Sequence, residues 1–409
     1  MISLEQHRDR ILSAVRPLAP TSIAVGESLG LVLAESVVGL VDLPGFTNSA
    51  MDGYAVVAAD LVDAAEDSPV QLPVLGDIPA GDIEPHDLAA GSCWRIMTGA
   101  PLPAGADAVV PVEQTDGRTD EVAIRVSPHP GAAVRNVGED VAAGDRVLES
   151  GVRLLPHHVA VCAAAGVASV DVIPAPRVAV ITTGDELVPV GTPLLHGQIH
   201  DSNGPMLAAA VRAAGATCVE VLHVGDRDDE SLADVVHRIA AEVDAIVTSG
   251  GISAGAYEPV KEAFAGGGAV QFDKVAMQPG KPQGFGVVGE RGVPLFALPG
   301  NPVSSLVSFE VFVVPALLRM AGRSGDRISV RAKAVRGWRS PPGRVQVARV
   351  VLSHGDEGWV VSPSGGQGSH ILGGLAVANA LALVPAEVVE VGQGDVVEVH
   401  LLPGEELPS

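Results

Sequence analysis

The sequence predicts a multidomain α/β protein built around one mostly parallel sheet. Its 409 residues exceed the length of a single domain. Over residues 177–322, continuous apolar strands alternate with helical patterns and end in glycine turns, which is typical of a parallel α/β sheet. Residues 45–137 and 323–409 instead contain short Val-rich runs separated by Pro, Gly and Asp, which predicts two β-rich domains beside the sheet.

Within the central segment, each strand leads into a helix or a glycine turn. The helix after the first strand opens at Asp201-Ser202-Asn203, with Ser202 or Asn203 as its cap. Ligands of such sheets bind outside the carboxyl ends of the strands. The expected strands span residues 177–186, 217–226, 244–253 and 295–302, and the expected helices span 201–215, 228–243 and 303–319. Towards the N-terminus, apolar spacing predicts a helix over residues 4–16 and a buried helix over 159–167.

Composition and charge exclude several classes of function. The formal net charge is −23, and aromatic residues make up 3% of the chain, so nucleic acid is an unsuitable partner. Cys93, Cys162 and Cys218 are odd in number and lack zinc spacing, so neither a disulfide framework nor a zinc site is expected. The N-terminus lacks the apolar core of a signal peptide, and the apolar stretch 306–318 is interrupted by charge and proline. We therefore expect a cytoplasmic protein without a membrane partner.

Three strand-end loops share the design of an anion-binding site. Each follows a buried strand with small or polar residues, and glycines allow a phosphate to approach the backbone closely. Any single loop is more simply an ordinary turn, but three at one sheet edge favour a common binding site. The candidate binding residues are Thr183, Asp185, Ser249, Gly250, Gly251, Ser253, Pro299, Gly300, Asn301 and Pro302.

Lysine is rare in this chain, and its distribution indicates a local site for an anion. Three of the four lysines fall between positions 261 and 281. Lys274 and Lys281 flank a Pro-Gly turn that can aim a side chain inward, as a compact charge for phosphate or oxyanion. Surface lysines on a strand and its turn remain an equally good interpretation.

Carboxylates at the same strand ends predict a divalent cation. Acidic groups would repel an anion unless a metal bridges the two, and oxygen ligands suit Mg²⁺. The candidates are Glu186, Asp226 and Asp52. Asp226 also fits a helix cap, and Asp52 also fits a hairpin turn. Thr98 is the only reactive-looking side chain in its own strand-and-turn segment.

A set of motifs over the whole chain resembles the molybdopterin molybdotransferase family, of the MoeA type and the gephyrin E domain. The motifs occur in the family's order and spacing. They are NSAMDGYAV (48–56), MTGAPLPAGADAVVPVE (97–113), GEDV (138–141), TTGDELV (182–188), DSNGPML (201–207), TSGGISAG (248–255), PGKPQGFG (279–286), LPGNPVSS (298–305) and GQGSH (366–370).

The resemblance implies four domains in an elongated homodimer. Residues 1–44 and 138–176 would form a split dimer-forming α/β linker domain, and 45–137 a β-rich inserted domain. Residues 177–322 would be the MogA-like molybdopterin-binding domain, and 323–409 a barrel-like C-terminal domain. The family inserts molybdate into adenylylated molybdopterin and releases AMP with a divalent cation, here Mg²⁺ with Zn²⁺ as the alternative. The upstream molybdopterin adenylyltransferase is a candidate partner.

The resemblance also carries site roles onto positions of this sequence. Catalytic positions match Asp52, Thr98, Asp140, Glu186 and Asp226, of which Glu186, Asp226 and Asp52 would hold the metal. Positions that hold molybdate or substrate phosphate match Lys281, Ser304, Arg349 and Ser369.

Two departures from the family pattern lie close to these positions. Ala256 replaces an acidic residue and Gln278 replaces a lysine, which leaves room for altered metal coordination or molybdate affinity. The alternative function is a non-catalytic molybdopterin-binding or scaffold protein of the gephyrin E-domain type.

Overall fold

The computed structural model describes residues 1–225, 230–252, 258–264, 268–324, 329–356, 358–368 and 371–402. The chain forms two compact units, which are taken in turn. Unit 1 comprises Met1–Thr21 and Ile173–Ser409, and unit 2 comprises Ser22–Val172.

Unit 1 contains the parallel sheet that the sequence predicts. Its strand order is β16-β13-β17-β21-β20-β18; the first four strands are parallel, while β20 is antiparallel to both of its neighbours. The strands are β13 (Arg177–Thr183), β16 (Thr217–Val224), β17 (Ala245–Ser249), β18 (Val270–Lys274), β20 (Pro282–Val288) and β21 (Val293–Leu298).

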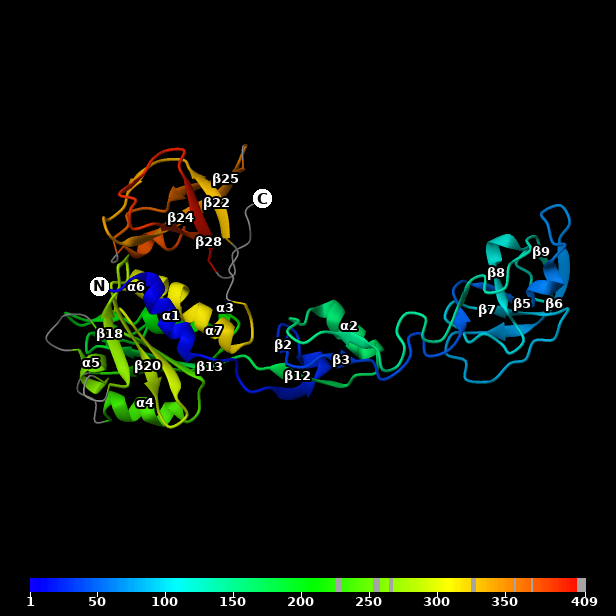
Figure 1. Cartoon of the computed structure of the whole chain (residues 1–409), viewed down its shortest axis with the longest axis horizontal. Coiled ribbons are helices and arrows are strands. Elements are labelled where there is room, and N and C mark those ends of the chain that lie inside the picture. Colours follow the sequence, from blue (N-terminus) through cyan, green and yellow to red (C-terminus); the bar gives the residue numbers. More distant parts are fainter. Residues whose placement is uncertain are drawn as a thin grey trace. The chain divides into compact units, whose positions relative to one another are not determined.

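Helices cover both faces of this sheet (Figure 1). Along β13, Val178 and Val180 enter one core, while Ala179 and Ile181 enter the other, as expected for a strand buried on both faces. One face carries α4 (Leu232–Ala240) and α5 (Pro259–Phe264). The other carries α1 (Leu4–Ala14), α3 (Asn203–Ala213), α6 (Pro302–Ser308), the π-helical segment η4 (Phe309–Val313) and α7 (Val314–Met320).

The first helix lies in a different domain from the one expected. The sequence assigned residues 1–44 to the split domain, but residues 1–21 belong to unit 1. The reason is packing: Leu4, Ile11 and Val15 are buried in the same core as Phe309 and Phe312. Helix α1 is therefore part of the α/β layer.

The apolar segment Pro302–Met320 is long and apolar enough to span a membrane, but 78% of its most apolar window is buried inside unit 1. It is a core helix. The π-helical turn at η4 precedes Pro315, which has no N–H to donate to the carbonyl four residues earlier, so the helix widens there.

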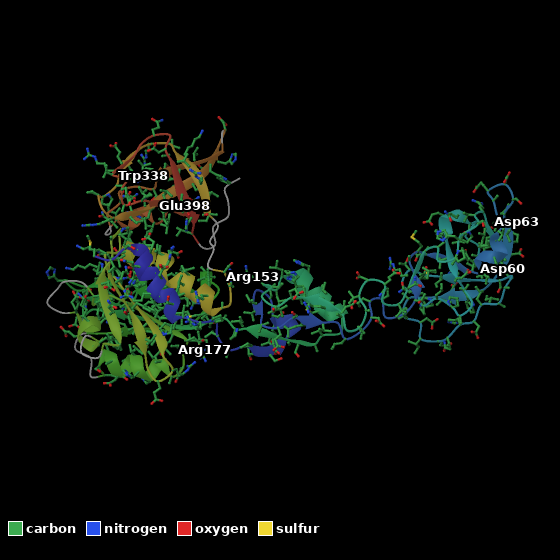
Figure 2. The ribbon with its side chains drawn as sticks, in the orientation of Figure 1. Asp60, Asp63, Arg153, Arg177, Trp338 and Glu398 are labelled. Atoms are coloured by element: carbon green, nitrogen blue, oxygen red, sulfur yellow. The ribbon has the colours of Figure 1, made fainter. Side chains whose placement is uncertain are left out.

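A closed five-stranded barrel forms the C-terminal part of unit 1. Its strands follow the order β24-β25-β22-β28-β26, and a further pairing of β26 with β24 closes the ring. Strand β19 (Met277–Gln278) leaves the α/β layer and pairs with β24. The barrel strands are β22 (Ser329–Ala334), β24 (Val345–Gly355), β25 (Gly358–Pro363), β26 (Ala380–Val384) and β28 (Val396–Leu401); β23 (Trp338–Arg339) and β27 (Glu390–Val391) form a separate ribbon. Figure 2 labels Trp338 and Glu398 on this barrel and ribbon.

Unit 2 contains a five-stranded sheet in the segment that the sequence predicts to be all β. Its order is β8-β5-β7-β6-β9. The strands are β5 (Gly53–Val56), β6 (Val70–Ile78), β7 (Cys93–Ile96), β8 (Ala108–Pro111) and β9 (Glu121–Ile124). Unit 2 holds none of the four lysines, and its carboxylates include the exposed Asp63 (Figure 2).

The rest of unit 2 combines short strands with one helix. A three-stranded sheet joins β1 (Thr21–Ala24), β12 (Ser169–Ile173) and β2 (Val32–Leu33), and β3 (Val37–Val38) pairs with β11 (Arg146–Leu148). Helix α2 (Pro156–Ala164) begins three residues before the expected start because Pro156 fits the first helical position, and it buries only Cys162. The expectation of a buried helix is corrected: α2 covers the sheet with one face only.

Candidate active site

A cavity of about 600 Å³ lies in unit 1 at the carboxyl ends of β13, β17 and β21. This is the edge at which a parallel α/β sheet binds ligands. Most of the loop residues expected to bind substrate line it, together with Lys281. Those predicted residues are Thr183, Glu186, Ser249, Gly250, Gly251, Lys281, Pro299, Gly300, Asn301, Pro302 and Ser304.

The buried side chain of Asn203 ties the three loops together. Its Nδ2 donates to Ser249 Oγ at 2.9 Å and to the carbonyl of Gly300 at 2.7 Å. Ser249 Oγ in turn contacts the carbonyl of Pro299 at 3.2 Å and Ser305 Oγ at 3.1 Å. Asn203 was expected only as a helix cap, and its place in the site was not predicted.

Two buried oxygens on the cavity wall have no hydrogen-bond partner within the part of the chain that the structure describes. They are Thr183 Oγ1 and Asn203 Oδ1. Their residues are 5% and 7% exposed, respectively. Because buried polar atoms are nearly always paired, these oxygens are suited to a polar ligand group entering the cavity.

Glycine is required where the second loop passes the first strand. Gly250 has φ +104°, and a Cβ there would lie 2.7 Å from the carbonyl oxygen of Thr183. Gly184 has φ +136°, and its missing Cβ leaves room for the carboxylate of Glu186. Gly184 and Gly250 thus allow the backbone after β13, the backbone after β17 and the carboxylate of Glu186 to lie at the cavity.

Asp201 is a second site residue, which the sequence indicated only as the start of a helix. It lines the cavity, accepts a hydrogen bond from Thr182 Oγ1 at 2.8 Å and accepts another from the N–H of Gly204 at 2.9 Å. Ser202 occupies the N-cap position, but its side chain makes no cap hydrogen bond. The expected N-cap position at Ser202 is thus confirmed, while the side-chain hydrogen bond at this helix start comes from Asp201.

Two fixed positive charges line the cavity, Lys281 from the α/β layer and Arg344 from the start of the barrel. Arg344 Nη1 donates to Gln278 Oε1 at 3.3 Å. The pairing of β19 with β24 brings these two residues together, and Val345 N donates to the carbonyl of Ala276 at 2.9 Å. Arg344 was not predicted, because it lies 66 residues from Gln278 in the chain.

Three predicted binding residues of unit 1 do not line this cavity. Asp185 is exposed, and Lys274 is exposed at the end of β18. Arg349 is 1% exposed, and its guanidinium donates to the carbonyls of Gly366, Gly368 and Ile371. Burial lowers the pKa of this guanidinium below its ordinary value.

Three predicted catalytic residues lie in unit 2. Asp52 Oδ1 accepts hydrogen bonds from Thr98 N at 2.7 Å and Thr98 Oγ1 at 2.8 Å, and these bonds lower the pKa of Asp52. Asp140 donates its N–H to the carbonyl of Leu43 at 3.0 Å and lines a separate hollow beside α2. These three residues thus belong to unit 2, whereas the cavity belongs to unit 1.

Asp226, Ser253 and Ser369 lie outside the described residues, as does Ala256. Within the described ranges, no group of three or more His, Cys, Asp or Glu side chains is arranged to hold a metal ion. Mg²⁺ needs fewer protein ligands when substrate phosphates and water complete its shell. Glu186 fits this requirement, because its carboxylate lines the cavity and has no hydrogen bond or ion pair in the described part of the chain.

A parallel α/β sheet with a glycine-lined cavity at its strand ends, which holds two cationic side chains, is typical of proteins that bind a phosphorylated small molecule. Three family profiles match this chain: the MoeA N-terminal region (domain I and II) over residues 2–166, a probable molybdopterin binding domain over 179–319, and the MoeA C-terminal region (domain IV) over 331–402. The chain belongs to the MoeA family of molybdopterin molybdenumtransferases, enzymes of molybdenum cofactor biosynthesis.

Individual relatives agree with this assignment. Molybdopterin molybdenumtransferase 2 of Mycobacterium tuberculosis is 48% identical over 407 residues, covering 98% of this chain and 99% of the relative. The molybdopterin molybdenumtransferase of Haemophilus influenzae is 33% identical, covering 98% of this chain and 100% of the relative. The crystal structure of a molybdopterin biosynthesis MoeA protein from Pyrococcus horikosii superposes with a TM-score of 0.82 at 34% identity, covering 99% of this chain and 100% of that one.

Proposed function

We propose that this protein inserts molybdenum from molybdate into adenylylated molybdopterin and releases AMP, with Mg²⁺ as the cation. The observation that carries the proposal is the convergence of Lys281, Arg344 and the unpaired carboxylate of Glu186 on one cavity in the described part of unit 1. Both substrates are anions, and the protein as a whole carries a net charge of −23. A local pair of cations is therefore needed to gather them.

Each wall of the cavity suits a different part of the reaction. The glycine loops at Gly250, Gly251 and Gly300 allow the pterin phosphate and its adenylate to lie against the backbone. Lys281, Arg344 and the hydroxyl of Ser304 can hold molybdate by charge-assisted hydrogen bonds.

Glu186, one of three carboxylate residues on the cavity wall with Asp201 and Glu258, can anchor Mg²⁺, with substrate phosphate and water as the other ligands. When bound, Mg²⁺ neutralises charge that develops on the phosphoanhydride as AMP leaves. Glu186 would hold the charge of Mg²⁺ in the cavity that Lys281 and Arg344 also line, so that both anions react in one place.

The roles of Asp52, Thr98 and Asp140 from unit 2 remain proposals from family resemblance, as do those of Asp226, Ser253 and Ser369. In a homodimer, unit 2 of one protomer would complete the cavity of the other. Exposed apolar residues on unit 2 support a dimer, namely Val38, Leu40, Val41 and Val161. We also propose a cytoplasmic location and the upstream adenylyltransferase as a partner.

The test is AMP release from adenylylated molybdopterin in the presence of molybdate and Mg²⁺. Glu186→Gln should slow AMP release far more than it weakens equilibrium binding of the adenylylated pterin. A non-catalytic scaffold or hand-over protein would release no AMP above background. Wild-type protein that binds the adenylylated pterin without AMP release would support that alternative.

A further inference from the structure

We propose that Gln283 is a positioning residue, which fixes the turn of residues 279–281 against helix α6 from behind the cavity wall. The inference rests on the proposed function for its kinetic consequence only. Gln283 does not line the cavity, so it acts through Lys281, which does.

The side chain of Gln283 is buried on β20, where it is 1% exposed. Its Nε2 donates to the carbonyl of Gly280 at 2.7 Å and to Ser308 Oγ at 2.6 Å. An amide nitrogen carries two N–H groups, so both of its donors are used. Because a buried amide is costly when it is unpaired, these two bonds hold the side chain in one position. One side chain therefore joins the tip of the turn to the last residue of α6.

Helix α6 connects this hydrogen bond to a glycine loop of the cavity. The helix begins at Pro302, which lines the cavity together with Gly300, and it ends at Ser308. Gln283 thus links the turn that carries Lys281 to the helix that follows the loop 299–302. These two segments carry the proposed subsites for molybdate and for the substrate phosphate. A rigid link between them keeps the two anions at a fixed separation, as their reaction requires.

The packing around Gly280 makes the position of the turn depend on Gln283. Gly280 has φ +96°, and a Cβ there would lie 2.7 Å from Ser308 Oγ and 3.3 Å from Gln283 Nε2. Glycine alone allows the backbone to approach these side chains so closely. Gly280 is buried, whereas Lys281, the next residue, is exposed. A displacement of the Gln283 amide therefore moves the main chain from which Lys281 projects.

Main-chain hydrogen bonds hold the stem of the same turn. Val275 N donates to the carbonyl of Lys281 at 2.8 Å, and Met277 N donates to the carbonyl of Val275 at 2.9 Å. The stem is thus held by the backbone and the tip by Gln283. The amides of Val275 and Met277 report on the turn, because their hydrogens exchange faster when it opens locally.

The first experiment measures amide hydrogen exchange at Val275 and Met277 in the substrate-free enzyme. We expect at least fivefold faster exchange in Gln283→Met than in wild type. Gln271→Met is the matched control and should exchange like wild type, because Gln271 is exposed on β18 and does not line the cavity. Urea unfolding establishes that each variant is folded. Equal exchange in wild type and Gln283→Met would overturn the proposal.

The second experiment distinguishes positioning from a merely structural role. Gln283→Met should raise the half-saturating molybdate concentration for AMP release at least fivefold, and that for adenylylated molybdopterin less than twofold. In a Lys281→Gln background, the same substitution should raise the molybdate requirement no more than twofold, because the group that Gln283 positions is gone. Equal rises for both substrates, or the same rise with and without Lys281, would overturn the proposal.

Ser308→Ala provides a further test if Gln283→Met does not fold. It removes one of the two hydrogen bonds of the Gln283 amide and keeps the bond to Gly280. Exchange at Val275 and Met277 should be at least twofold faster than in wild type, and unchanged exchange would contradict the proposal. The exchange measurement needs no substrate, so absence of AMP release in wild type would count against the proposed function alone.

Discussion

The amide of Asn203 and the hydroxyl of Ser249 share a buried hydrogen bond of 2.9 Å, which links the start of α3 to the end of β17. The same amide donates to the carbonyl of Gly300 at 2.7 Å, at the turn that follows β21. One side chain therefore sets the spacing of two loops that line the cavity. Its Oδ1 has no partner in the described part of the chain and is available to a ligand.

Asn203→Ala should impair both stability and activity. It removes the hydrogen bonds to Gly300 O and to Ser249 Oγ, which keeps Pro299 O and Ser305 Oγ as partners, and each such bond contributes about 0.5–1.5 kcal/mol to the free energy of unfolding. AMP release should fall at least tenfold because the loops lose their spacing. Urea unfolding and AMP release measure the two effects.

Asn136→Ala is the matched control, because Asn136 is exposed. Its free energy of unfolding should stay within about 0.5 kcal/mol of wild type. Wild-type stability and activity in Asn203→Ala would show that the loops keep their spacing without this side chain.

Gly250→Ala should damage the cavity by sterics alone. The new methyl would lie 2.7 Å from the carbonyl of Thr183, in a backbone conformation with φ +104°. The variant should lose about 1–3 kcal/mol of stability and most of its activity. Gly26→Ala is the control, since Gly26 has open space around its Cβ position and no positive φ. Equal unfolding midpoints for the two variants would contradict the steric argument.

The α/β sheet could be predicted because its signal is local. The continuous apolar run Val178–Ile181 and the glycines after the parallel strands appear directly in the sequence. The position of Arg344 could not be predicted, because it depends on the pairing of Gln278 with Gln346 across two folded layers. The burial of Arg349 could not be predicted either, since a guanidinium suits an anion and a set of carbonyls equally well in sequence.

His7 should make the protein less stable in mild acid. The pKa of His7 is lowered from 6.5 to about 4, chiefly by burial and secondly by the neighbouring charge of Arg10, while Asp273 opposes the shift. Below pH 6.5 the unfolded chain binds a proton at His7, whereas the folded chain binds this proton only near pH 4. Stability therefore falls as pH decreases through this window, by up to about 3 kcal/mol for this group.

Urea unfolding between pH 7 and pH 4 measures this effect. His7→Gln should reduce the dependence of the free energy of unfolding on pH, whatever it does to stability at pH 7. His196→Gln, at an exposed position, should keep the wild-type dependence. An identical pH dependence for wild type and His7→Gln would remove His7 as the cause.

Lys281 and Arg344 should each contribute to molybdate affinity, and salt should reveal their charge. A charge-assisted hydrogen bond contributes about 1.5–3 kcal/mol, so Lys281→Gln and Arg344→Gln should each raise the half-saturating molybdate concentration by about 10- to 100-fold. Both cations line one cavity, so added salt should weaken molybdate binding to wild type more than to either variant. Lys333→Gln is the control, because Lys333 lies on the barrel strand β22 and does not line the cavity. If Lys281→Gln, Arg344→Gln and wild type showed the same molybdate requirement at low salt, the anion would have to bind elsewhere on the protein.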